Sequence, residues 1–218
     1  MNDCLLFGAA VLLLVGLLYF AKKESRPGQL LTKPLLSALF VLTALMAPHR
    51  QDSYFAFILA GLVLCVAGDV FLIFFDSRRL FLAGLASFLI GHVLYAIAFF
   101  SVSSPGVLAW TGAALSVVAS CAIFIWLRPS LGRMLVPVAA YVAIITAMVI
   151  GASSVMGDAQ FGSTGRLLVF YGALLFYISD IFVARHRFMK KEYRNRLFGL
   201  PLYYTGQFMI ALSVRFIG

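Results

Sequence analysis

Residues 54–75 read YFAFILAGLVLCVAGDVFLIFF, a run of 22 residues in which Asp69 is the only charged side chain. A helix of this length rises about 33 Å, which matches the hydrocarbon thickness of a bilayer. Asp76 and the pair Arg78-Arg79 follow the run and close it with charges. The stretch therefore predicts a membrane-spanning helix with one acidic residue inside the membrane.

The whole chain has the same apolar character. Of its 218 residues, 63% are hydrophobic and 11% are charged, and the mean hydropathy is +1.02. Soluble domains contain about 45–50% apolar and about 25% charged residues, so a single core would not bury this much apolar surface. We expect an all-α polytopic membrane protein in which residues 1–218 form one domain.

Seven further apolar runs have the length of a membrane span and are separated by charged residues or helix breakers. The eight expected spans are Cys4–Phe20, Leu30–Ala47, Tyr54–Phe75, Leu80–Phe100, Gly106–Trp126, Arg133–Gly151, Gly165–Ala184 and Phe198–Ile217. We do not expect the first run to be a cleaved signal peptide, because acidic Asp3 precedes it and basic residues follow it.

The basic residues predict the orientation of these spans. Thirteen Lys and Arg residues fall on the side of the odd-numbered loops and three on the other side, with Lys33 inside a span. This bias places the odd loops in the cytoplasm and both termini outside. The net charge of +9 is therefore a topology signal and not a nucleic-acid-binding surface. The short loops favour a bacterial inner membrane.

Short patterns in the two halves of the chain resemble each other. Residues 68–72 (GDVFL) match residues 179–183 (SDIFV), and Gly91-His92 aligns with Gly206-Gln207. Two parallel four-helix repeats would produce such matches, but small residues also recur by chance in apolar helices. Both explanations stay open from the sequence.

Two acidic residues, Asp69 and Asp180, lie inside expected spans, whereas the other six lie in loops or at the termini. An intramembrane acid is costly and marks a candidate functional site. Counting from the cytoplasmic ends of the spans puts both acids about 6–9 Å deep. We expect them to share a cavity on the cytoplasmic side, where one protonated and one ionised carboxyl would act as general acid and base.

Polar side chains of other spans are expected to converge on the same cavity. The candidate substrate-binding residues are Lys33, His92, Tyr95, Tyr203, Tyr204 and Gln207. Each has a structural alternative. Lys33 could extend to the membrane interface, His92 and Tyr95 could form a buried hydrogen-bonded pair, and the residues of the last span could pack between helices.

The familiar motifs of several enzyme classes are absent from the sequence. It contains no GxSxG, HExxH or P-loop pattern, and its three cysteines lie far apart without metal-ligand spacing, so we expect no metal and no cofactor. Paired acids suit hydrolysis through an oxocarbenium-like cation. A proton-coupled transporter is the main alternative, and a structural or lipid-binding protein is a further one. An aspartyl protease is disfavoured, because Val66 stands where its Gly-x-Gly-Asp pattern needs glycine.

Taken in order, these residues resemble the YhhN family of integral membrane lysoplasmalogenases. The resemblance covers nearly the whole chain and rests on Lys33-Pro34, Gly68-Asp69, Phe88-x3-His92-x2-Tyr95, Ser179-Asp180 and Tyr203-x3-Gln207. It implies cleavage of the vinyl ether bond of a lysoplasmalogen to a fatty aldehyde and glycerophosphoethanolamine or glycerophosphocholine, without a metal. It also implies that the two intramembrane acids are catalytic.

The residues are compatible with that reaction. One acid would protonate a vinyl carbon and the other would stabilise the resulting cation, with the two assignments left open. Lys33 would hold the phosphate of the lysophospholipid, and His92, Tyr203 and Gln207 would position water or glycerol oxygens. The substrate would enter laterally from the inner leaflet of the surrounding membrane lipid.

Overall fold

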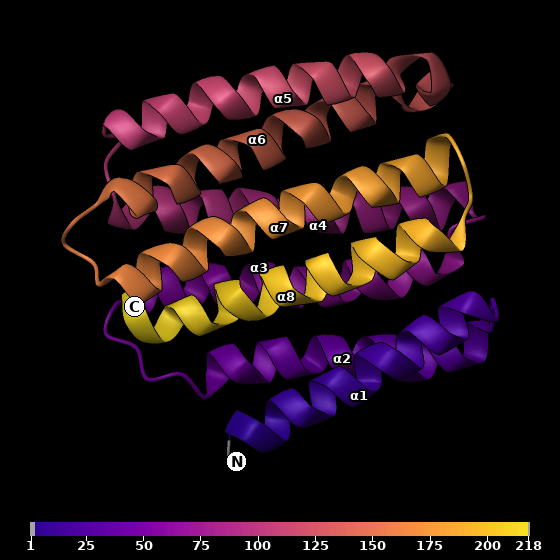
Figure 1. Cartoon of the computed structure of the whole chain (residues 1–218), viewed down its shortest axis with the longest axis horizontal. Coiled ribbons are helices and arrows are strands. Elements are labelled where there is room, and N and C mark those ends of the chain that lie inside the picture. Colours follow the sequence, from indigo (N-terminus) through magenta and orange to yellow (C-terminus); the bar gives the residue numbers. More distant parts are fainter. Residues whose placement is uncertain (1–2, 218) are drawn as a thin grey trace.

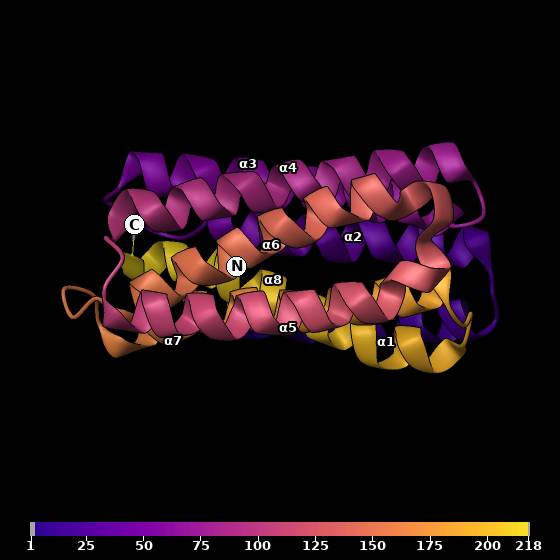
Figure 2. The same ribbon diagram turned by 90° about the horizontal axis from the view of Figure 1, so that it is seen from above.

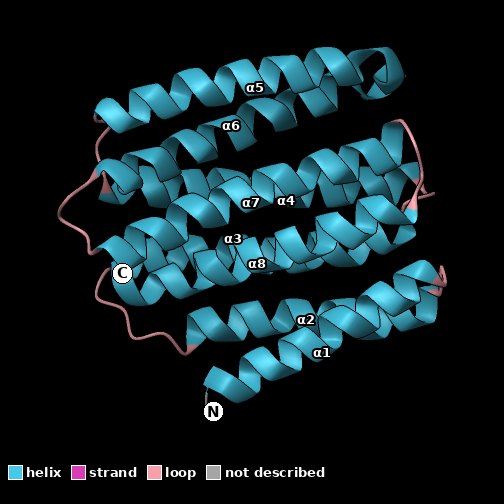
Figure 3. Ribbon diagram, viewed as in Figure 1, coloured by secondary structure: helices cyan, strands magenta, loops and turns pink. Residues whose placement is uncertain are grey.

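The computed structural model describes residues 3–217, which fold into α-helices joined by short loops and 3-10 turns, without a strand (Figure 3). The helices are α1 (Asp3–Lys22), α2 (Arg26–Leu45), α3 (Asp52–Phe71), α4 (Arg78–Val102), α5 (Val107–Leu131), α6 (Leu135–Gly157), α7 (Ser163–Phe188) and α8 (Tyr193–Ile217). They run up and down, so α1 begins and α8 ends at the same end of the bundle (Figure 1). The all-α prediction is confirmed.

Seven stretches of the described residues are long and apolar enough to cross a membrane, whereas the sequence led us to expect eight. Six of them contain one α-helix each. The seventh, Val107–Gly157, is an unbroken run of 51 residues that contains α5, the 3-10 turn η2 (Gly132–Met134) and α6. The run folds back at Gly132, whose positive φ of 47° favours glycine, and α5 and α6 lie side by side (Figure 1).

Each helix extends beyond the span expected from the sequence, at one end or at both. The longest extensions are those of α5, which reaches Leu131 instead of Trp126, of α6, which reaches Gly157 instead of Gly151, and of α8, which begins at Tyr193 instead of Phe198. In the added part of α6, the Ser153 hydroxyl donates to the carbonyl oxygen four residues earlier, which satisfies this polar side chain within the helix. Hydropathy identifies only the apolar part of such a helix, so the expected boundaries were too short.

The closest helix pairs, α3 with α4 and α7 with α8, use glycine in the same way. Gly61 faces Gly91 in the first pair and Gly172 faces Gly206 in the second. A Cβ on any of these glycines would lie 2.8–3.2 Å from the carbonyl oxygen of its partner, so the backbones approach as closely as they can. The duplication into two four-helix repeats stays a prediction.

The remaining contacts place the polar residues in the interior. α2 packs on α3 and α8, and α6 packs on α4 and α7, so α2 and α6 lie between the outer helices (Figure 2). The peripheral helices α1 and α5 carry many exposed apolar side chains, as expected for surfaces that face lipid. The inner helices therefore have neighbours on several sides, and their polar side chains face other helices.

Candidate active site

Asp69 on α3 and Lys33 on α2 form a buried ion pair. Lys33 Nζ lies 3.0 Å from Asp69 Oδ1 and also donates to the Asp69 backbone carbonyl oxygen at 3.0 Å. Lys33 is 7% exposed and Asp69 is 1% exposed. Lys33 therefore does not extend to the membrane interface, and its ammonium group is engaged by the nearest acid.

Two hydroxyl groups complete the surroundings of Asp69. Ser37 Oγ donates to Asp69 Oδ2 at 2.6 Å, and the Tyr203 hydroxyl donates to the same oxygen at 2.7 Å. The Tyr204 hydroxyl lies 3.2 Å from Ser37 Oγ, so it contacts Ser37 and is linked to Asp69 through this residue. Sequence reasoning missed Ser37, although its position four residues after Lys33 puts both on one face of α2.

Asp180 on α7 has different surroundings. The Tyr141 hydroxyl of α6 donates to Asp180 Oδ2 at 2.6 Å, and no other hydrogen bond from residues 3–217 reaches this carboxyl. Asp180 is partly exposed to the cavities around it, whereas Asp69 is buried. Tyr141 was also not predicted from the sequence, where it is the only tyrosine of a mostly apolar span.

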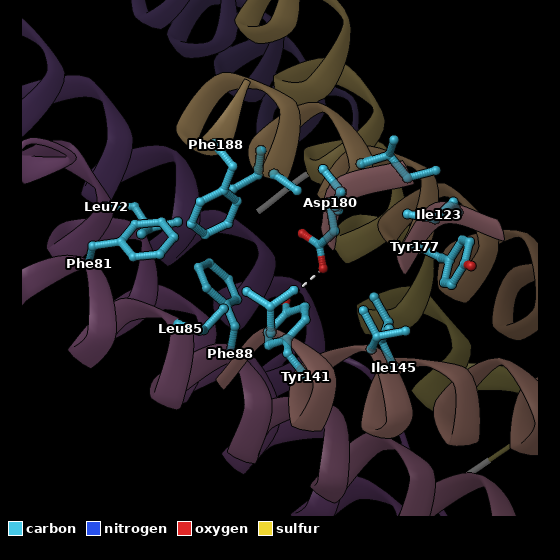
Figure 4. Close-up of a pocket in the computed structure, with 16 residues that line it drawn as sticks. Leu72, Phe81, Leu85, Phe88, Ile123, Tyr141, Ile145, Tyr177, Asp180 and Phe188 are labelled. Carbon is cyan, nitrogen blue, oxygen red and sulfur yellow. Dashed lines mark hydrogen bonds between the residues drawn. The ribbon is translucent and has the colours of Figure 1, made fainter. Parts of the chain in front are cut away.

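Two cavities meet at Asp180. The first lies among α4, α5, α6 and α7, and its lining is aliphatic and aromatic apart from Asp180 and two tyrosines (Figure 4). The second lies among α2, α3, α7 and α8 and contains Lys33, Asp69 and Tyr203 together with Asp180. Both cavities have Phe88 and Asp180 in their walls. The structure thus places the two intramembrane acids around one polar cavity that adjoins an apolar one.

A third group of polar side chains lies deeper in the core. The Tyr95 hydroxyl donates to Gln207 Oε1 at 2.8 Å and lies 3.8 Å from Cys65 Sγ. The alternative in which Tyr95 and His92 form a hydrogen-bonded pair is therefore wrong, because the Tyr95 hydroxyl bonds to Gln207 of α8. Both ring nitrogens of His92 and Nε2 of Gln207 are buried without a hydrogen-bond partner among the described residues. The His92 ring lies against Tyr141, with 5.2 Å between ring centroids.

Ion pairs join the loops at the end of the bundle near the polar cavity. Asp76 lies 2.8 Å from the Arg26 guanidinium and 3.7 Å from the Lys191 ammonium. The positive charge of Lys191, followed by the hydrogen bond from Arg26, lowers the pKa of Asp76 below its usual range. Glu192 pairs with Lys190 at 2.6 Å, and this contact lowers the pKa of Glu192.

Within residues 3–217, no group of three or more His, Cys, Asp or Glu side chains is arranged to hold a metal ion. The polar groups around the second cavity include the two carboxyls, the Lys33 ammonium group, the Tyr203 hydroxyl and the Arg196 guanidinium. Such a set can donate a proton, stabilise a cation and orient a polar substrate.

Comparisons with known proteins identify relatives of this chain. The model of the YhhN family matches residues 28–214. Lysoplasmalogenase TMEM86A of Bos taurus is 35% identical over 160 residues, which are 72% of this chain and 64% of the relative. Lysoplasmalogenase TMEM86B of Homo sapiens is 36% identical over 162 residues, which are 72% of this chain and 62% of the relative.

Lysoplasmalogenase TMEM86B of Sus scrofa is 31% identical over 183 residues, which are 83% of this chain and 72% of the relative. The matches to the bovine and human proteins span less than two thirds of the length of those relatives. No solved structure matches the chain significantly. The family match extends from the first turn of α2 to the last turn of α8, so this chain belongs to the YhhN family.

Proposed function

We propose that this protein hydrolyses the vinyl ether bond of lysoplasmalogens, releasing a fatty aldehyde and glycerophosphoethanolamine or glycerophosphocholine. The observation that carries the proposal is the position of Asp180, whose carboxyl borders an apolar cavity on one side and the cavity of Asp69 on the other. A single-chain lipid has the same order of polarity: hydrocarbon chain, vinyl ether, glycerol and charged headgroup. The reactive bond lies beside Asp180 when the chain fills the apolar cavity.

Asp180 is the proton donor in this mechanism. The vinyl carbon that accepts the proton is the one attached to the hydrocarbon chain, so the donor has to stand at the end of the chain cavity. Asp180 accepts one hydrogen bond, from Tyr141, and otherwise faces mostly apolar side chains. An apolar setting favours the neutral carboxylic acid, which is the form that can give a proton.

Asp69 is the ionised partner. Its carboxylate receives hydrogen bonds from Ser37 and Tyr203 and an ion pair from Lys33, a set of donors that suits a negative charge. On the headgroup side of the vinyl bond, this charge stabilises the oxocarbenium ion that protonation creates. The two acids differ in their surroundings, and the difference supports different roles.

The steps balance without a cofactor. Asp180 gives its proton to the vinyl carbon attached to the hydrocarbon chain. The positive charge is then shared between the other vinyl carbon and the ether oxygen bonded to it. Water attacks that carbon and returns a proton to the Asp180 carboxylate, which leaves a hemiacetal. The hemiacetal hydroxyl loses its proton, the glycerol oxygen gains one, and the bond between carbon and glycerol oxygen breaks to release the aldehyde.

His92 and Gln207 are proposed to hold the attacking water. Both ring nitrogens of His92 and Nε2 of Gln207 are buried and have no partner within residues 3–217, and a buried polar atom of this kind calls for one. The His92 ring also contacts Tyr141, the residue that orients Asp180. Tyr141 therefore links the ring that is proposed to hold the water to the acid that has to take its proton.

The chain is proposed to cross the membrane eight times. A straight helix of 51 residues would measure about 77 Å, more than twice the hydrocarbon thickness, so Val107–Gly157 has to cross as two helices. The excess of basic residues on the odd loops places those loops in the cytoplasm and the polar cavity in the cytoplasmic half. Location in a bacterial inner membrane stays a prediction from the short loops.

Aldehyde release from a defined lysoplasmalogen by the purified protein in detergent tests the proposal. Asp180→Asn removes the proton donor and is expected to lower kcat at least about 100-fold. Asp69→Asn removes the stabilising charge, and we expect a loss of about 100- to 1000-fold. Asp158→Asn, in the loop before α7, serves as the matched control and keeps full activity.

Thermal unfolding of each variant confirms that it folds before its activity is compared. No turnover by the unaltered protein on either the choline or the ethanolamine substrate would overturn the proposed reaction. Full activity of Asp180→Asn would overturn the role of this acid. The alternative transporter, reconstituted in liposomes, would move a solute with an imposed proton gradient and release no aldehyde.

A further inference from the structure

Arg196 is a partly buried cation in the wall of the polar cavity. It lies in the first turn of α8, and one guanidinium nitrogen donates to Gln29 Oε1 at 2.9 Å. The guanidinium carbon lies 5.6 Å from the centre of the Phe75 ring. No Asp or Glu carboxylate of residues 3–217 lies within 4.0 Å of this guanidinium, and most of its five N–H donors are without a protein acceptor.

Other Lys and Arg side chains near this cavity already have acidic partners, and the ring of His186, which also lines the cavity, is hydrogen-bonded among the described residues only to the backbone oxygen of Glu192. Lys33 is paired with Asp69 inside the cavity. Arg185 donates to Asn195 at 2.6 Å and to Glu192 at 3.2 Å. At the rim, Arg26 and the lysines of the loop before α8 pair with acids. The cavity therefore contains one guanidinium that no carboxylate of residues 3–217 contacts directly, although Glu24 and Asp76 attract it from beyond ion-pair distance.

The chemistry of this group selects its ligand. A guanidinium presents a planar fork of donors that binds two oxygens of a phosphate at once, which a lysine ammonium does not. Partial burial reduces screening by water and strengthens the attraction. The first turn of α8 adds the partial positive charge of a helix N-terminus. An anion with several equivalent oxygens is the ligand that fits.

The position of Arg196 along α8 suits the substrate. Arg196 precedes Tyr203, the residue that hydrogen-bonds Asp69, by seven residues, or about 10 Å along the helix axis. In a lysoplasmalogen, the glycerol separates the vinyl ether from the phosphate. With the vinyl ether between Asp180 and Asp69, the phosphate extends along α8 towards Arg196.

We propose that Arg196 binds the phosphate of the lysophospholipid headgroup and that Gln29 orients its guanidinium. The assignment deepens the proposed function and rests on it. It gives Arg196 the role that the sequence suggested for Lys33, because the Lys33 ammonium is engaged by Asp69. A phosphodiester is thus recognised at the mouth, while the carboxyls act farther inside.

A pair of substrates separates phosphate binding from catalysis. Arg196→Gln is expected to raise KM for a lysoplasmalogen about 10- to 100-fold, as for the loss of charged hydrogen bonds, and to leave kcat within about twofold. The same variant should hydrolyse a 1-alkenylglycerol, which lacks the phosphate, as well as the unaltered protein does. Arg194→Gln, on an exposed position two residues away, is the control and should change neither substrate.

Binding of a saturated alkyl lysophospholipid makes the result independent of turnover. This analogue has no vinyl bond. Arg196→Gln should raise its Kd by the same factor as the KM for the lysoplasmalogen, even if the unaltered protein hydrolyses neither substrate. If inorganic phosphate competes with this lipid for the unaltered protein but not for Arg196→Gln, the site binds phosphate in general. If phosphate does not compete, the site is specific for the lipid headgroup. Equal losses on both substrates, or an unchanged Kd, would overturn the assignment.

Discussion

Replacing Lys33 by methionine should destabilise the protein far more than replacing Arg26 by methionine. Each change removes the cation of an ion pair, and the two pairs have similar distances of 3.0 Å and 2.8 Å. They differ in burial. The side chains of Lys33 and Asp69 are 9% and 2% exposed, whereas those of Arg26 and Asp76 are 56% and 63% exposed.

The expected magnitudes follow from that contrast. Removing one partner of a buried pair costs about 3–5 kcal/mol, because the other charge is left uncompensated. Asp69 keeps its bonds from Ser37 and Tyr203, so the lower value of about 3 kcal/mol applies to Lys33→Met. At about 2–4 °C per kcal/mol for a chain of this size, Tm falls about 6–12 °C. An exposed pair contributes about 0–1 kcal/mol, so Arg26→Met should lower Tm by less than about 4 °C.

Thermal unfolding in detergent, followed by the far-ultraviolet circular dichroism of the helices, measures both variants. The double variant Lys33→Met/Asp69→Asn removes both charges and should recover at least half of the lost Tm. Equal shifts for Lys33→Met and Arg26→Met would refute the reasoning. So would additive losses in the double variant, because they would mean that the two side chains are not coupled.

Three further predictions test other parts of the structure. Ile145→Trp fills the apolar cavity and should lower kcat/KM about 10-fold for a long-chain lysoplasmalogen but not for a short-chain one, and equal losses would argue against a chain cavity. In Gly206→Ala the new Cβ meets the Gly172 carbonyl oxygen at 2.8 Å, at a cost of about 1–3 kcal/mol in thermal unfolding. The control Gly8→Ala has no atom within 4 Å and should keep Tm or raise it, and equal behaviour of the two would contradict the close packing. Asp76→Asn should lower Tm slightly at pH 7, because the contacts with Lys191 and Arg26 that lower the pKa of Asp76 stabilise only its ionised form. The difference in Tm between the variant and the unaltered protein should disappear as the pH falls below 3.8, and a difference that persists in acid would contradict this.

The helices could be predicted from the sequence because the apolar runs have the length of a span and end at charges. The hairpin of α5 and α6 shows why the number of spans is harder to obtain. Helical structure continues to Leu131 and η2 follows directly, so the polar residues that separate the two runs in the sequence, such as Arg128 and Arg133, lie within helical turns around Gly132. Length and hydropathy therefore treat the hairpin as one stretch.

Four residues of the polar cavity could also be identified, because polar side chains in apolar spans are few: Lys33, Asp69, Asp180 and Tyr203. The other four predicted residues (His92, Tyr95, Tyr204 and Gln207) do not line this cavity, and its residues Gln29 and Arg196 were not predicted. The partners of the predicted residues could not be identified. Whether Lys33 faces lipid or Asp69 depends on the rotation and depth of α2 relative to α3, and no pattern within either helix encodes that relation. The same limit explains Tyr95, which shares a helix face with His92 but bonds to Gln207 across the bundle.

The surroundings of the two acids offer a physical reason for having two. A single carboxyl would have to be protonated to start the proposed reaction and ionised to stabilise its cation. In the proposed mechanism Asp69, which accepts from three donors, supplies the negative charge, and Asp180, with one donor beside an apolar cavity, exchanges the proton. Lys33 fits this division, because its ammonium group is paired with Asp69 and not with Asp180. Because Lys33 is engaged in this pairing, the proposed mechanism assigns the phosphate to a second cation, Arg196.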